Sequence, residues 1–206
     1  MERSKKSGMI HRPLPRRNDP EGERVPESLP CIVDVHVHLF PDKLFTAIRN
    51  WLDEFAWRVR YRLRSPEVIE FLLARGVDRV VGLHYAHKPG MARTLNTYMA
   101  GLCRDYPQVI GTATVFPGEE GAGAILGEAF ERGLIGVKLH AHVQFFDLDS
   151  DEMNEIYDVC LRRGQPLVMH VGREPKSSVY HYQRDPYRIC GADKLEPVLK
   201  QYPGLR

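Results

Sequence analysis

The chain has 206 residues, of which 43% are hydrophobic and 27% charged, a composition typical of a globular protein and not of a fibre or membrane protein. Its net charge of +2 is too small to favour nucleic acid or an anionic membrane as a partner. The four cysteines form no Cys-x-x-Cys pair, and no apolar segment follows the basic N-terminus. We therefore expect a soluble cytoplasmic protein with neither nucleic-acid nor membrane partners.

The chain divides into a polar leader and a patterned remainder. Residues 1–30 are rich in Pro, Arg, Lys, Glu and Ser, and this composition predicts a disordered leader. From residue 31 onward, short apolar runs alternate with segments of helical periodicity, the pattern of parallel strands joined by helices. The expected strands are residues 31–40, 77–86, 108–117, 134–142 and 165–172, and the expected helices are residues 48–59, 65–76, 91–107, 123–133, 149–164 and 193–203.

The number of these units predicts an incomplete α/β barrel. A closed eight-stranded barrel takes about 250 residues. Residues 31–206 have room for about five βα units, and the final "GLR" resembles the start of a sixth strand. We expect a partial TIM-like (β/α) barrel or a small open sheet, with residues 31–206 as one incomplete domain.

The stretch "VDVHVHLFP" at residues 33–41 places two histidines one residue apart in an apolar run. Because strand side chains alternate between faces, Asp34, His36 and His38 are expected to point the same way. Two imidazoles then converge on one point. This arrangement suits a metal ion, although an ordinary half-exposed strand has the same pattern.

Six of the nine histidines fall at the ends of expected strands, namely His36, His38, His84, His140, His142 and His170. The carboxyl ends of parallel strands form one rim, which holds the active site in α/β barrels. A catalytic zinc site uses three protein ligands and a water, and histidine nitrogen is a preferred donor. We expect His36, His38 and His170 to hold a divalent ion, zinc by this donor set.

"DVHVHLFP", followed by "GVKLHAHVQ" and "PLVMHVG", resembles the amidohydrolase-related metal-dependent hydrolases. The resemblance covers residues 31–206 and extends to the branch that includes aminocarboxymuconate semialdehyde decarboxylase. It implies a distorted (β/α)8 barrel whose ion is held by His-x-His on strand one, His on strand five and Asp on strand eight, with an acid or base His on strand six. The first three positions correspond to His36, His38 and His170, and the last two have no counterpart in these 206 residues.

Further side chains at the rim are candidates for substrate chemistry. Lys138 shares a face with His140, and both are candidate catalytic residues. Lys138 could pair with a substrate carboxylate, or bridge two ions as a carbamate as in two-metal relatives, and His140 could orient substrate. Asp34 is expected to accept the second N–H of a ligand imidazole. Arg173 and His181, in the loop after the fifth strand, are expected to bind substrate.

These features leave several functions open. The first is metal-dependent hydrolysis of a small amide, ester or lactone. A carboxy-lyase reaction at the same site is the alternative, with a small-molecule substrate in either case. A third is a non-catalytic fragment that forms a homo-oligomer or depends on a second chain for the missing half of the barrel, because open sheet edges favour association. A phosphoesterase has less support, because it needs more ligands on the middle strands.

Overall fold

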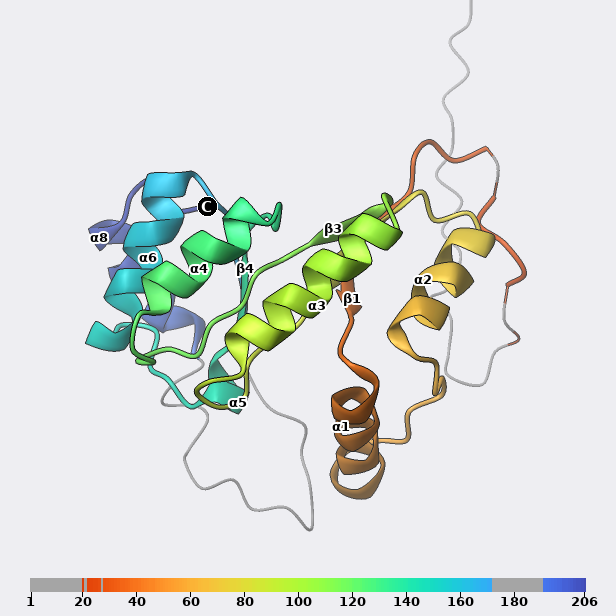
Figure 1. The fold of residues 1–206 in the computed structure, drawn as a ribbon, viewed down its shortest axis with the longest axis horizontal. Coiled ribbons are helices and arrows are strands. Elements are labelled where there is room, and N and C mark those ends of the chain that lie inside the picture. Colours follow the sequence, from red (N-terminus) through yellow and green to blue (C-terminus); the bar gives the residue numbers. More distant parts are fainter. Residues whose placement is uncertain (1–19, 21, 27, 172–190) are drawn as a thin grey trace, which may run out of the picture.

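The computed structural model describes residue 20 and residues 22–26, 28–171 and 191–206, and its elements alternate between strand and helix (Figure 1). The strands are β1 (Val33–His38), β2 (Arg79–Leu83), β3 (Val109–Gly111), β4 (Val137–His140) and β5 (Leu167–His170). The helices are α1 (Asp42–Phe55), α2 (Ser65–Ala74), α3 (Ala92–Asp105), α4 (Ala122–Glu131), α5 (Ala141–Gln144), α6 (Asp151–Arg163) and α8 (Leu195–Gln201), and the 3-10 turn η1 (Ala192–Lys194) precedes α8.

All five strands run parallel in chain order. β1, β2 and β3 form one sheet, and β4 and β5 form a second. A parallel bridge between Ala113 and Val137 joins the two sheets, and Lys138 N donates to Ala113 O at 2.8 Å across the same junction. The result is an open arc of strands, which confirms the predicted partial TIM-like barrel.

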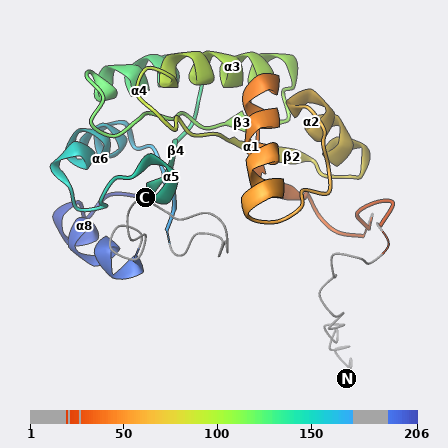
Figure 2. The ribbon, with the colours of Figure 1, turned by 90° about the horizontal axis from the view of Figure 1, so that it is seen from below.

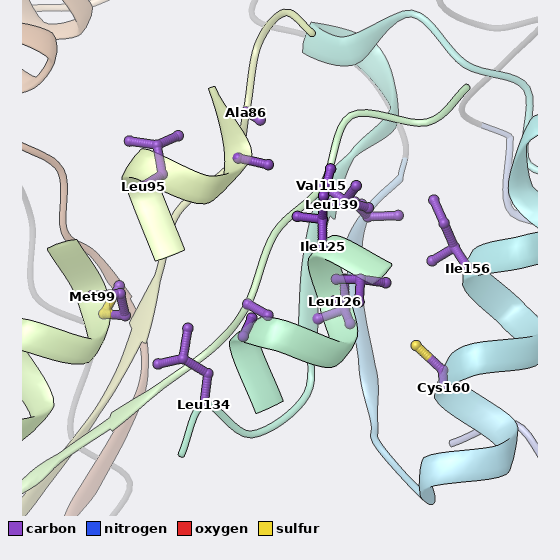
Figure 3. Packing of buried hydrophobic residues seen from close by; sticks show 14 of the residues in the cluster. Ala86, Leu95, Met99, Val115, Ile125, Leu126, Leu134, Leu139, Ile156 and Cys160 are labelled. Atoms are coloured by element: carbon purple, nitrogen blue, oxygen red, sulfur yellow. The ribbon is translucent and has the colours of Figure 1, made fainter. Parts of the chain in front are cut away.

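The core lies between this arc and the helices α3, α4 and α6 (Figure 2). Figure 3 shows Met99 of α3, Leu126 of α4 and Ile156 of α6 directed into it, and each is fully buried. Burying an aliphatic side chain of this size contributes about 1.5–3 kcal/mol. A Cβ on Gly111 of β3 would lie 2.7 Å from Cγ of Met99, so glycine lets α3 pack directly on the strand.

Each expected helix and strand has a counterpart, and the strands are shorter than predicted. The first helix covers residues 42–55 and not 48–59, and the short helix α5 takes up the last two residues of the expected strand 134–142, so the prediction that His142 ends a strand is wrong. Ser65 is the first residue of α2, and its Oγ accepts from Phe40 N at 2.9 Å and donates to Phe40 O at 2.8 Å. Ser65 therefore joins the start of α2 to the chain leaving β1.

Most of the expected leader lies outside the described residues. Within the part that is described, Val25 N donates to Arg75 O at 2.7 Å, and Val25 packs against the core. Among the described helices, none is both long enough and apolar enough to cross a membrane.

Candidate metal centre and active site

The two histidines of β1 bring their Nε2 atoms to 3.3 Å from each other. Two nitrogens that each lie about 2.0–2.1 Å from one tetrahedral ion are about 3.3 Å apart. The same separation allows one ring to donate a hydrogen bond to the other when no ion is bound. The spacing of His36 and His38 therefore fits two ligands of a single divalent ion.

A β-bulge in β1 sets which side chains accompany this pair. The pairing with β2 shifts between Asp34 and Val37, so that two residues of β1 face one residue of β2. Asp34 and Val37 pair with β2 residues two positions apart and share one face, which is opposite to that of His38. The prediction that Asp34 shares a face with both histidines is therefore wrong. Its Oδ1 accepts from the backbone N–H of His36 at 3.1 Å and supports the main chain of β1.

Burial keeps the β1 imidazoles neutral. Desolvation lowers the pKa of His38 to about 3, and the charge of Lys138 acts in the same direction. Desolvation and Lys138 also lower the pKa of the more exposed His36, against an opposing effect of Asp34. A metal ligand must be deprotonated at its donor atom. Both rings are therefore in the protonation state that metal binding requires at neutral pH.

The ends of β4 and β5 carry the second pair of rings. The register places His140 opposite His170, and the two rings stack with centroids 4.1 Å apart. Burial, followed by the charges of His170 and Lys138, lowers the pKa of His140 to about 2. Val143 N donates to Nδ1 of His140 at 3.4 Å, so the hydrogen of the neutral ring is assigned to Nε2.

Lys138 lies two residues before His140 on β4 and is 1% exposed. Burial lowers its pKa to about 8, so the ammonium is still mostly protonated at neutral pH. Its charge lowers the pKa of His36, His38, His140 and His170, so Lys138 is near enough to act on all four rings. The structure thus brings together both candidate catalytic residues and the three predicted ligands in one region.

Tyr85 joins the two ring pairs, and the sequence reasoning did not include it. It follows β2, and its ring meets His38 and His140 edge-on at centroid distances of 5.8 and 5.0 Å. It also contacts Phe40 at 5.2 Å. In the sequence, the available signal for Tyr85 was its position as an aromatic residue just after β2, the strand that pairs with β1.

The donor set fits a divalent ion in part. Within the described residues, no three His, Cys, Asp or Glu side chains are close enough together to form a complete metal cage. His36 and His38 form a suitable pair, whereas the ring of His170 is stacked on His140. His170 remains a predicted third ligand, and its charge lowers the pKa of His38.

Other predicted rim residues have different positions. His84 is buried, and its Nε2 lies 3.1 Å from Oδ1 of Asn96 on α3, a structural contact on the helix side of the sheet. His142 is buried in α5. Arg173 and His181, the predicted substrate-binding residues, lie outside the described residues.

A parallel barrel arc with histidines at the carboxyl ends of its strands defines the class of protein. The amidohydrolase family model matches residues 33–206, so the chain belongs to the amidohydrolase family. No curated protein matches the chain.

Three solved structures share the fold. An amidohydrolase II structure covers 85% of this chain with a TM-score of 0.61 and 14% identity, and the match covers 65% of that protein. A putative amidohydrolase from Staphylococcus aureus has a TM-score of 0.60 and 15% identity, with coverage of 85% and 65%. A manganese complex of 5-carboxyvanillate decarboxylase from Novosphingobium aromaticivorans has a TM-score of 0.64 and 19% identity, with coverage of 89% and 66%. The chain thus spans about 65% of the length of these proteins.

Proposed function

We propose that this chain forms part of a divalent-metal enzyme that acts on a small molecule bearing a carboxylate or carbonyl group. The observation that carries the proposal is the 3.3 Å separation of Nε2 of His36 and Nε2 of His38, two neutral imidazoles at the rim of a barrel arc. His170 is the proposed third ligand. A bound ion supplies Lewis-acid polarisation of a carbonyl or carboxylate oxygen and an acidic water.

Lys138 and His140 are proposed to bind and orient the substrate. Lys138 provides a buried positive charge that attracts a carboxylate. His140 is neutral, and its Nε2–H can donate a hydrogen bond to a substrate oxygen. Both side chains come from β4, so they face the site from one side with a fixed separation.

Two reactions are consistent with these groups. Hydrolysis of an amide, ester or lactone is the function expected from the sequence, and a divalent ion held by His36 and His38 would supply an activated water for it. Decarboxylation is supported by a separate observation: Lys138 and His140 offer a buried cation and an N–H donor to an anionic substrate such as a carboxylate. The structural likeness to 5-carboxyvanillate decarboxylase gives decarboxylation further support.

Metal titration followed by paired assays tests this function. The purified full-length chain, freed of metal, is titrated calorimetrically with Zn²⁺ and with Mn²⁺, because histidine donors favour zinc and the decarboxylase complex holds manganese. The loaded protein is then assayed for carbon dioxide release from aromatic carboxylates and for hydrolysis of lactones and amides. We expect one ion per chain and metal-dependent turnover in one assay. Absence of metal binding contradicts the proposal.

Association with a second chain is a separate proposal that rests on the open strand edges. Among the described strands, β1 pairs with β2 alone, and Val33 and Val35 are 42% and 66% exposed. Leu167 N of β5 donates to Arg206 O at 2.7 Å, so only a short part of that edge is covered within the described chain. Open apolar edges favour pairing with another polypeptide. Light scattering at high protein concentration is expected to show an oligomer, and a stable monomer contradicts association.

A further inference from the structure

Gln144 is a buried amide, 2% exposed, at the end of the short helix α5. Its Nε2 donates to Ala86 O and to Val115 O, both at 2.8 Å, and its Oε1 accepts from the backbone N–H of His140 at 2.7 Å. A primary amide has two N–H donors and one carbonyl acceptor. Each of these groups therefore has a partner.

The three partners come from consecutive strand ends. Ala86 follows β2, Val115 follows β3, and His140 is the last residue of β4. Ala86 and Val115 are fully buried, so their carbonyl groups have limited access to water. Removing the amide would leave these buried polar groups unpaired, which is unfavourable. The Gln144 side chain thus links the segments that follow β2 and β3 to the end of β4, where His140 lies.

The turn that carries Gln144 also fixes the ring of His140. Val143 N donates to Nδ1 of His140, so α5 contacts both the backbone and the imidazole of this residue. Phe145, which ends α5, has φ of 56° and is the one non-glycine residue with positive φ in the described chain. A left-handed conformation is unfavourable for a residue with a side chain. Phe145 adopts this conformation directly after Gln144.

We propose that Gln144 is a positioning residue of the candidate site, which sets the place of the His140 imidazole and of the His170 ring stacked on it. The inference rests on the proposed function for the role of His140. It goes further in assigning the geometry of the β4 end to a side chain that does not face the substrate.

Gln144→Met tests the inference, because methionine has a similar length and lacks the amide. Gln165→Met is the matched control: Gln165 Oε1 accepts from Gly136 N at 2.8 Å at the opposite end of β4. The full-length chain, labelled with ¹⁵N-histidine, is compared by NMR without metal. We expect displaced ring signals of His140 and His170 in Gln144→Met and wild-type signals in Gln165→Met. In the assay that gives turnover, kcat is expected to fall up to about 100-fold, with KM nearly unchanged.

Wild-type ring signals in a folded Gln144→Met protein would overturn the inference. Should that protein not fold, Gln144→Glu replaces it, because glutamate keeps the acceptor for His140 N–H while losing at least one donor. Displacement of the same two ring signals in Gln144→Glu supports positioning, and unchanged signals overturn it. The NMR comparison needs neither metal nor substrate, so a failure of the proposed function in the metal titration is distinguishable from a failure of this inference.

Discussion

The two strand ends that carry the site histidines are supported in different ways. At the end of β1, His36 is exposed, and the hydrogen bonds of Ser65 act two residues beyond His38, on Phe40. At the end of β4, Gln144 bonds directly to the backbone of His140, and Val143 bonds to its ring. The β1 imidazoles are thus held by the strand, whereas the β4 imidazole is held by hydrogen bonds of its own.

This difference matches the different tasks proposed for the two ends. A metal ion draws its own ligands into place, because coordination bonds are stronger than the contacts that orient a free imidazole. A group that binds substrate without a metal bond needs support from the surrounding protein. The comparison teaches that one site can combine a ligand pair in which His36 is exposed with a substrate-facing ring that has a hydrogen bond of its own.

The largest expected effect is on metal binding at the β1 end. His36→Ala removes one of the two converging nitrogens, and we expect metal affinity to fall by at least about 100-fold, because loss of an outer-shell partner alone costs 10–100-fold. Calorimetric titration with Zn²⁺ measures the change. His87→Ala is the control, since it removes a histidine from the loop after β2. Equal affinity in both variants would show that His36 is not a ligand.

The second effect concerns the buried cation of β4. Because folding lowers the pKa of Lys138 from 10.5 to about 8, its charge destabilises the folded state fully below pH 8, and this penalty disappears as pH rises to 10.5. The free energy of unfolding of the wild type should therefore gain up to about 3 kcal/mol relative to Lys138→Met over this range. Denaturant titrations at pH 7.5 and 10.5 measure the difference, with the exposed Lys88→Met as control. A constant difference contradicts the burial of a charged Lys138.

The third expected effect is a loss of folding stability in acid, caused by His38 at the end of β1 and His140 at the end of β4. The pKa values of His38 and His140 are lowered to about 3 and about 2, so below pH 6.5 the unfolded chain takes up protons that the folded chain does not. Stability is therefore lost as pH falls, by about 2 kcal/mol for each ring at pH 5. His38→Gln and His140→Gln should each reduce the drop measured between pH 7 and pH 5 by this amount. A full wild-type drop in either variant would show that its ring is accessible to protons.

The smallest effects compare a buried valine of β4 with an exposed valine of β1. Val137→Thr on β4 places a hydroxyl where the native side chain is 0% exposed, and we expect a loss of about 2 kcal/mol in unfolding free energy. Val35→Thr on β1, at 66% exposure, should change stability by less than about 0.5 kcal/mol. Thermal or chemical unfolding measures both. A large loss for Val35→Thr would indicate that another chain covers β1.

Periodicity predicted most of the fold because it records burial directly. The apolar residues of α3, such as Leu95 and Met99, are spaced to face the strands and are buried there. The histidines at strand ends were found in the same way, since parallel strands bring their carboxyl ends to one rim. The predicted positions of His140 and His170 follow from that rule, and their stacking agrees with it.

The remaining features depend on contacts between residues far apart in the chain. Gln144 bonds to Ala86 and Val115, and nothing in "HAHVQF" indicates partners on other strands. Tyr85 has neighbours on β1 and β4 that only the curvature of the arc brings near. The bulge in β1 depends on how this strand pairs with β2, so simple alternation placed Asp34 on the wrong face.

That bulge also has an evolutionary consequence. Between Asp34 and Val37, β1 contains one residue more than the β2 segment opposite it. Deleting a single residue there would restore regular pairing and leave the facing direction of His38 unchanged, because everything after the bulge keeps its own register with β2. Loss of Val35 from this strand would therefore keep both histidines and leave the pairing of Val37 and His38 with β2 unchanged.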